Sequence, residues 1–338
     1  MPRLGGVGLL AALAAGAAVL VAGGANPRLV GAVLAGSTLA WAVGLLDDLR
    51  GLGPWTKLAG QVAAAAVSVA LGLRIEFVSV PWGWGGSGGM VALGPWSAVL
   101  TGAWLVALSN AVNLLDGLDG LAAGVVAIAA VPSAFAARSR GFVEAAGLLV
   151  VVGAGCLAFL RYNFSPARIF MGDSGALMVG FAFAAAAAAG TAKGPAAVAL
   201  LVPVVSLGVP LFDTAWAVVR RIASRRSIME ADLHHVHHRL VAAGRSAPQA
   251  VLMLYAASAG LGAIAVALPP QGRASLALGL ALAGAAVAFW MRGRRKTPAP
   301  VSAARTGAGH EGSGKSHLRH PAGSYQAGSG YPGSRALR

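Results

Sequence analysis

The sequence predicts an all-α polytopic integral membrane protein with about ten transmembrane helices. Of its 338 residues, 57% are hydrophobic and 11% are charged, and the mean hydropathy is +0.71. A soluble domain carries about 25% charged residues, so this composition excludes an ordinary soluble enzyme. The apolar residues are also gathered into repeated stretches, many of them close to the length of about 20 residues that crosses a bilayer.

Ten apolar stretches predict the individual spans. Several are rich in Ala and Gly, which lets helices pack closely within lipid. The loop at 74–94, between the third and fourth stretches, is long enough to hold a small hairpin. The predicted spans are residues 5–24, 29–46, 58–73, 95–115, 120–137, 143–160, 174–192, 195–218, 248–268 and 273–291.

The basic residues predict the orientation of the chain. Most of the 26 lysines and arginines fall in loops that share one side with the C-terminal tail. Cytoplasmic loops are enriched in Lys and Arg, so this side is predicted to be cytoplasmic and the loop at 74–94 external. The chain then divides into a transmembrane domain at 1–292 and a disordered basic tail at 293–338. Because the net charge of +15 comes from span ends and tail, we expect no nucleic-acid partner.

The aspartates are distributed unevenly across the predicted membrane. All seven fall at or near the cytoplasmic face, whereas the external loops contain none. Ionisable groups at membrane depth are costly and usually functional, so a shared site explains the set better than chance collection in loops. The seven are Asp47, Asp48, Asp116, Asp119, Asp173, Asp213 and Asp232.

Asp47 and Asp48 end the second predicted span, in the stretch GLLDDLRG. Adjacent carboxylates repel each other, and a cation is the simplest partner that makes the pair favourable. A pair exposed to water at a helix end is the plain alternative.

The stretch NAVNLLDGLDGLAAG, residues 110–124, has polar residues spaced three apart. With 3.6 residues per turn, such positions wind around a helix and do not share a face. Gly117 and Gly120 instead predict a break, with Asp116 ending one helix and Asp119 near the start of the next. Both carboxylates would then face one cytoplasmic cavity. The ligand spacing of a calcium loop is absent.

The stretch RYNFSPARIFMGDSGALMVGF predicts a loop followed by a helix start. Pro166 keeps the preceding helix from continuing, and Asp173 and Ser174 stand where a cap would begin the next span. A glycine-lined helix N-terminus also favours phosphate. Asn163 and Phe170 are not needed for capping, which favours a binding site over a plain cap.

Four of the seven histidines lie in EADLHHVHHRL, at positions 234, 235, 237 and 238. Three of them could share a helix face, which leaves zinc as one interpretation. No cysteine lies nearby, and a phosphate contact fits the basic, hydrogen-bonding residues as well. A solvated polar loop is the remaining alternative.

These residue types favour chemistry with a divalent metal and a phosphorylated substrate. Oxygen-rich sites prefer Mg²⁺ or Mn²⁺, and Mg²⁺ typically uses one or two carboxylates together with substrate phosphates. Phosphoryl transfer asks a protein mainly for positioning and charge neutralisation. The residues alone therefore predict a metal-dependent enzyme acting on a phosphate compound at the cytoplasmic face.

Five stretches together resemble the polyprenyl-phosphate N-acetylhexosamine-1-phosphate transferases, of the glycosyltransferase family 4 type. The likeness extends from PRLGG at residues 2–6 to about residue 245, and the HHVHHRL form is similar to the undecaprenyl-phosphate GlcNAc-1-phosphate transferase branch. The family is related to phospho-N-acetylmuramoyl-pentapeptide transferase. The stretches are Asp47-Asp48, NAVNLLDGLDGLA, NFSPARIFMGDSGAL, PLFDTAWAVVRR and ADLHHVHHRL.

The resemblance implies transfer of a sugar-1-phosphate, GlcNAc-1-phosphate above all, from a UDP-amino sugar to polyprenyl phosphate with release of UMP. It implies a bacterial plasma-membrane protein whose active site and tail are cytoplasmic, a Mg²⁺ cofactor that Mn²⁺ could replace, and it leaves a homodimer open. The implied metal ligands are Asp173 and Asp48; the catalytic residues are Asp47, Asp48, Asp173, His235, His237 and His238; and the substrate-binding residues are Asn113, Asp116, Asp119, Asn163 and Phe170.

Two departures from the family pattern qualify the resemblance. Gly51 stands where the family often has a further acid after the acidic pair. The PRLGG stretch normally follows an N-terminal span, so we expect a full-length product with about eleven spans. Two other functions stay open from the sequence: a phospho-MurNAc-pentapeptide transferase of peptidoglycan synthesis, and a transporter of a phosphorylated solute. A transporter would place its acids near mid-membrane, whereas these cluster at one edge.

Overall fold

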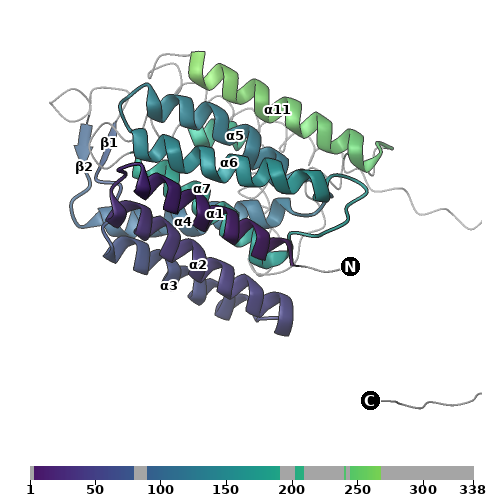
Figure 1. Cartoon of the computed structure of the whole chain (residues 1–338), viewed down its shortest axis with the longest axis horizontal. Helices are drawn as coiled ribbons and strands as arrows, with labels where there is room; N and C mark the ends of the chain where they lie inside the picture. The colour runs from purple at the N-terminus through teal and green to yellow at the C-terminus, as the bar shows by residue number, and fades with distance from the viewer. Residues whose placement is uncertain (1–3, 80–89, 191–201, 209–239, 241–243, 268–338) are drawn as a thin grey trace, which may run out of the picture. The chain divides into compact units, whose positions relative to one another are not determined.

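The computed structural model describes residues 4–79, 90–190, 202–208, 240 and 244–267 (Figure 1). These residues form a bundle of long helices with one short hairpin, and all of them fall within the compact unit Met1–Arg294. The helices are α1 (Gly5–Ala22), α2 (Pro27–Arg50), α3 (Pro54–Ala70), α4 (Trp96–Leu115), α5 (Leu121–Arg138), α6 (Val143–Asn163), α7 (Gly172–Ala189) and α11 (Ala247–Ala267).

Seven of these helices are long and apolar enough to cross a membrane, all except α3. The predicted all-α polytopic fold is therefore confirmed. α3 has 17 residues, one fewer than the shortest of these seven, and lies at the lower end of the range of about 17–25 residues for a span. The predicted span at 273–291 and most of that at 195–218 lie outside the described residues, so the total number of spans stays a prediction. The predicted division at residue 292 likewise falls outside them.

The predicted hairpin is present in the loop between α3 and α4. Strands β1 (Phe77–Ser79) and β2 (Met90–Ala92) pair antiparallel, with Val78 opposite Val91. In Figure 1 the hairpin lies at the left end of the bundle, and α1 begins at the opposite end. α2 and α4 end at the end opposite the hairpin, and α5 and α7 begin there. We call it the carboxylate end, because these helix ends carry Asp47, Asp48, Asp116 and Asp173.

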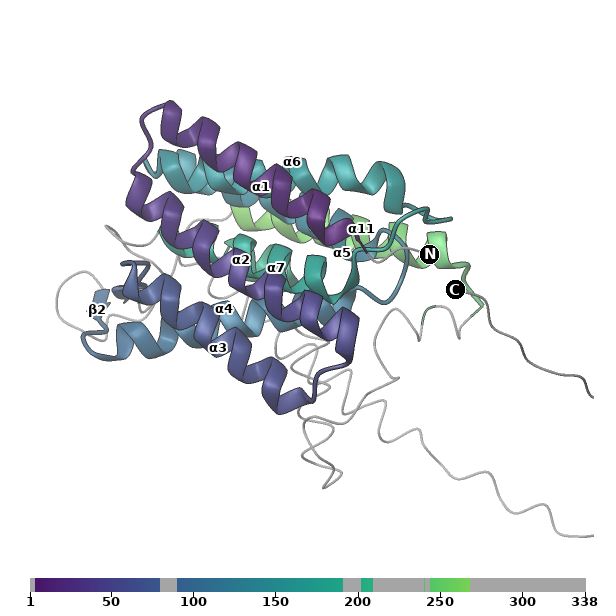
Figure 2. The same cartoon turned by 60° about the horizontal axis from the view of Figure 1, so that its bottom comes forward.

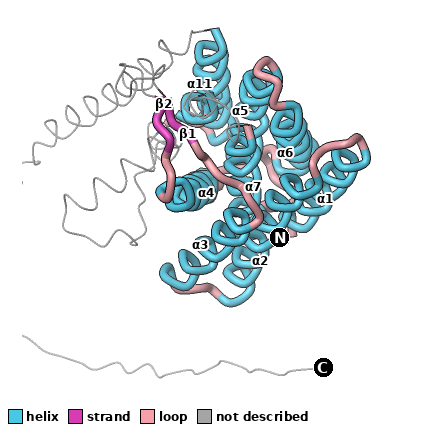
Figure 3. Tube along the Cα trace, turned by 90° about the vertical axis from the view of Figure 1, so that its left-hand side faces the viewer, coloured by secondary structure: helices cyan, strands magenta, loops and turns pink. Residues whose placement is uncertain are grey.

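α7 is the central helix of the bundle. Every residue from Ser174 to Ala189 is buried, and α7 packs against α1, α2, α4, α5 and α6. Figure 3 shows α7 with these helices around it, and Figure 2 shows the same bundle with α2 and α3 brought forward. A helix that is apolar on all sides belongs in such a position.

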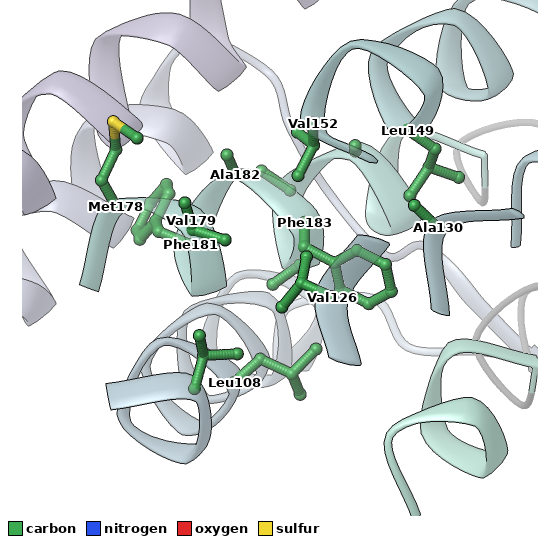
Figure 4. Close-up of a cluster of buried hydrophobic side chains, with 14 of the residues drawn as sticks. Leu108, Val126, Ala130, Leu149, Val152, Met178, Val179, Phe181, Ala182 and Phe183 are labelled. Atoms are coloured by element: carbon green, nitrogen blue, oxygen red, sulfur yellow. The ribbon is translucent and has the colours of Figure 1, made fainter. Parts of the chain in front are cut away.

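The core is built where α7 meets its neighbours. Phe181 and Phe183 of α7 are fully buried, and Figure 4 shows them among Leu108 of α4, Val126 of α5 and Leu149 of α6. A run of alanines from Ala184 to Ala189 completes α7 and allows close helix packing. The N-terminus of α7 is therefore held by the whole bundle, which makes it a rigid support for a site.

Candidate active site at the carboxylate end

Asp47 and Asp48 lie in the last turn of α2, which ends at Arg50. The C-terminus of a helix carries partial negative charge, so acidic residues there are unfavourable unless another group compensates them. The structure gives each of the two carboxylates a different partner, and these two partners define the site.

Asp48 contacts the N-terminus of α7. Its Oδ1 accepts a hydrogen bond from the backbone N–H of Asp173 and its Oδ2 one from that of Ser174, both at 3.0 Å. The plain-cap alternative for Asp173 and Ser174 does not hold: α7 begins at Gly172 after Met171, and no side chain makes a cap hydrogen bond there. The free N–H groups at a helix N-terminus favour a carboxylate, and here the neighbouring helix α2 supplies it.

Gly44 of α2 allows this approach. A Cβ atom at Gly44 would lie 2.5 Å from the carbonyl carbon of Asp173 and 2.5 Å from the Cα of Ser174. Both atoms are backbone, so neither can rotate away. The absence of a side chain at position 44 therefore sets the distance between the end of α2 and the start of α7.

Asp47 contacts Lys57, and Lys57 also contacts Asp173. The Lys57 Nζ lies 2.8 Å from Asp47 Oδ2 and forms an ion pair with Asp173 Oδ2. Lys57 belongs to the first turn of α3, where its N–H donates to the carbonyl of Gly53. Three elements, α2, α3 and α7, thus converge on one ammonium group.

Asn113 of α4 completes this cluster. Its Nδ2 donates to Asp173 Oδ1 at 3.0 Å, and its Oδ1 accepts from Lys57 Nζ at 3.3 Å. One turn away, the amides of Asn110 and Gln61 donate to each other and join α4 to α3. Asn113 therefore orients the Asp173 carboxylate from a fixed helix–helix contact.

The break predicted in the DGLDG stretch is confirmed. α4 ends at Leu115 with Asp116 as its C-cap, and α5 begins at Leu121 after Gly120 in the left-handed region at φ 79°. Burial, and after it the negative charges of Asp173, Asp48 and Asp119, raises the pKa of Asp116 to about 7. Burial is the larger cause, and the three carboxylates that add to it place several acidic groups near one another at this end.

Asn163 and Asp119 connect the two loops beside the site. Asn163 Oδ1 accepts from the N–H of Gly120 at 3.0 Å, and its Nδ2 donates to the carbonyl of Ile169 at 2.9 Å. Asp119 Oδ2 accepts from the N–H of Ala167 at 3.0 Å. Asn163 is only 2% exposed, so the structure gives it a part in holding the loops. A substrate contact for Asn163 stays a prediction.

We expect Asn163→Ala to lower the free energy of unfolding by roughly 1–3 kcal/mol, because it leaves a buried N–H and a carbonyl without their partner. Thermal unfolding of the purified protein in detergent measures the change. Thr38→Ala is the matched control, since within the described part of the chain the Thr38 hydroxyl donates to the carbonyl of Leu34 in its own helix and joins no two loops. Equal losses for the two variants would contradict the assigned part of Asn163.

The structure brings together five of the predicted site residues at the carboxylate end, and Phe170 lies in the adjacent loop with 37% of its surface exposed. His235, His237 and His238 lie outside the described residues, so their contacts stay predictions. The sequence analysis did not predict Lys57 as a site residue. Its place near a helix N-terminus, where a positive charge is unfavourable, is the signal that could have identified it. The five residues are Asp47, Asp48, Asn113, Asp116 and Asp173.

The carboxylates at this end fit a Mg²⁺ site in which the protein supplies only part of the metal's coordination shell. In the described ranges, no group of three or more His, Cys, Asp or Glu is placed to hold a metal ion. Mg²⁺ is usually bound by one or two carboxylates, with waters and substrate phosphates filling its shell. Two carboxylates already share a cation here, but they are Asp173 and Asp47, whereas the pair predicted to bind the metal is Asp173 and Asp48.

Comparison with known proteins relates the chain to membrane transferases. The model of glycosyl transferase family 4 matches residues 30–191. A Bacillus subtilis (strain 168) protein named probable undecaprenyl-phosphate N-acetylglucosaminyl 1-phosphate transferase is 39% identical over 255 residues, which cover 75% of this chain and 70% of the relative. Decaprenyl-phosphate N-acetylglucosaminephosphotransferase of Mycolicibacterium smegmatis is 37% identical over 317 residues, covering 85% and 77%.

A second group of relatives carries a different name. The phospho-N-acetylmuramoyl-pentapeptide-transferase of Thermotoga neapolitana (strain ATCC 49049) is 36% identical over 161 residues, which cover 44% of this chain and 50% of that protein. The residues matched by the family model include Asp47, Asp48, Asn113, Asp116 and Asp173.

Proposed function

This chain belongs to glycosyl transferase family 4, and we propose that it transfers GlcNAc-1-phosphate from UDP-GlcNAc to a polyprenyl phosphate, releasing UMP and starting a cell-envelope glycopolymer. The names of its relatives at 37% and 39% identity support the donor and the acceptor. One observation of the structure carries the proposal. Carboxylates from α2 and α7 converge on a single cationic group, the Lys57 ammonium, at one end of the helix bundle.

The proposed reaction exchanges one phosphorus–oxygen bond for another. An oxygen of the lipid phosphate attacks the β-phosphorus of UDP-GlcNAc and forms a new P–O bond, while the bond to the bridging oxygen breaks and UMP leaves. The second pKa of a phosphate monoester is about 6, so at neutral pH the acceptor is mostly ionised. A carboxylate is then needed less as a base than for positioning.

The Mg²⁺ proposed for this site neutralises charge on the diphosphate when it is bound. Asp173 is the proposed ligand, because its side chain is partly exposed at the start of α7 and its Oδ1 is already oriented by Asn113. Asp48 holds the start of α7 through two N–H bonds, and Asp47 faces Asp173 across Lys57. We further propose that the carboxylate end faces the cytoplasm, following the distribution of Lys and Arg in the whole sequence.

Release of UMP from the purified protein tests the proposal. We expect UMP when the protein in detergent receives Mg²⁺, undecaprenyl phosphate and UDP-GlcNAc, and no UMP when EDTA replaces Mg²⁺. UDP-MurNAc-pentapeptide is the competing donor, because a second group of relatives is named for transfer of phospho-N-acetylmuramoyl-pentapeptide. The relative of this group described above covers less of the chain than the GlcNAc-1-phosphate transferases do. UMP from that donor alone would assign the alternative function, and no UMP from either donor would contradict a transferase.

A further inference from the structure

The Lys57 ammonium is the cation that lies between the carboxylates of Asp47 and Asp173. Its Nζ is bonded to Asp47 Oδ2, to Asp173 Oδ2 and to Asn113 Oδ1. Its side chain is 17% exposed and that of Asp47 is 13% exposed, whereas Asp173 is 37% exposed. Lys57 is therefore enclosed on the Asp47 side and more open on the Asp173 side.

Each carboxylate has one oxygen fixed by an amide and one oxygen turned to Lys57. Asp47 Oδ1 accepts from the backbone N–H of Leu52 at 2.6 Å, and Asp173 Oδ1 accepts from Asn113 at 3.0 Å. The remaining Oδ2 atoms are the two that the ammonium contacts. Asp173 Oδ2 is therefore the oxygen that a metal ion bound at Asp173 would have to take from Lys57.

The position of Lys57 in its own helix has no local explanation. It lies in the first turn of α3, where the helix dipole disfavours a positive charge. Asp47 likewise lies at the unfavourable end of α2. Each residue compensates the other, so the ion pair across the α2–α3 connection is what makes both placements favourable.

We propose that Lys57 is an internal counter-ion that keeps the Asp47–Asp173 site intact without metal and that competes with the divalent cation for Asp173. The flexible stem of lysine lets its ammonium withdraw, and Asp47 then retains it while Asp173 Oδ2 becomes free. Lys57 is thus a positioning residue that sets the metal affinity. The inference rests on the metal site of the proposed function, but not on the identity of the sugar donor.

The test compares wild type, Lys57→Met and Lys57→Arg without any nucleotide or lipid. Thermal unfolding is measured in EDTA and in saturating Mn²⁺, and Mn²⁺ affinity is measured by titration of the free ion's EPR signal. We expect Lys57→Met to unfold at a lower temperature than wild type in EDTA and to gain more from Mn²⁺. Its dissociation constant for Mn²⁺ should be about tenfold lower, since a charge-assisted competitor has been removed.

Two further variants separate charge from position. Lys57→Arg keeps the positive charge, so it should keep metal-free stability and bind Mn²⁺ no more tightly than wild type. Arg161→Met removes one positive charge from an exposed position in the last turn of α6 and should change neither measurement. A tighter Mn²⁺ affinity in both methionine variants would reduce the effect to net charge and overturn the proposal.

Each outcome for Lys57→Met is decisive. A variant that is unfolded in EDTA but folded in Mn²⁺ supports the proposal, because the metal then replaces the ammonium. A variant that fails to fold in both conditions, or that responds to Mn²⁺ like wild type, overturns it. If wild type itself binds no Mn²⁺, the metal site of the proposed function fails instead, and UMP release decides the transfer reaction separately.

Discussion

Replacing Asp173 with asparagine is expected to lower the rate of UMP release by about a thousandfold or more, as the loss of a principal electrostatic contact does in other enzymes. The side chain keeps its shape, and the backbone N–H of residue 173 still donates to Asp48. What is lost is the negative charge that faces Lys57 and the proposed metal. The initial rate with saturating donor and acceptor measures the effect.

Glu144→Gln is the matched control for this change. Glu144 lies in the first turn of α6 at the hairpin end, and its Oε1 accepts from the N–H of Asn26 at 2.9 Å. Glutamine retains an acceptor at this point and removes one carboxylate charge, so the rate should stay within about twofold of wild type. If Asp173→Asn retained more than a tenth of the wild-type rate, Asp173 would have no part in the chemistry.

Gly44→Ala is expected to reduce both stability and activity. The new methyl group would meet the backbone of Asp173 and Ser174, so α2 and α7 must move apart. Overpacking of this kind costs about 1–3 kcal/mol, and the same movement pulls Asp48 from the N–H groups that it accepts. Thermal unfolding and UMP release measured on one preparation follow the two losses together.

The chain provides a control in the same helix. Among the described residues, a Cβ atom at Gly31 would meet no heavy atom within 4 Å outside the backbone of its own helix. Gly31→Ala should therefore leave activity unchanged and stabilise the protein slightly, because alanine forms helix better than glycine by about 1 kcal/mol. If the two alanine variants behaved alike, close approach at Gly44 would not be what holds the site together.

The helices were predictable because long apolar stretches and glycine-marked breaks are local signals. The break after Leu115 follows from Gly117 and Gly120, and the structure places the start of α5 at Leu121, within one residue of the predicted start. α2 extends to Arg50, beyond the predicted end at 46, because the charged last turn lowers the local hydropathy without ending the helix. Hydropathy alone marks the apolar part of a helix and not its full length.

The partners within the site could not be predicted from local pattern. Asp173 and Ser174 have the residue types of a helix cap, yet the acceptor at α7 is Asp48, more than 120 residues away in sequence. Lys57 was interpreted as one of many basic loop residues, and only the packing of α3 against α2 and α4 shows that it joins two carboxylates. Such pairings depend on tertiary contacts between helices.

The route of the donor's β-phosphate tests the central claim most directly. The purified protein would receive UDP-GlcNAc carrying ³²P in the phosphate attached to the sugar, together with undecaprenyl phosphate and Mg²⁺. Transfer of GlcNAc-1-phosphate predicts that the label moves into the organic phase, one equivalent for each UMP formed, and that Asp173→Asn prevents it. Label that stays in the aqueous phase as UDP while GlcNAc enters the lipid would contradict the claim.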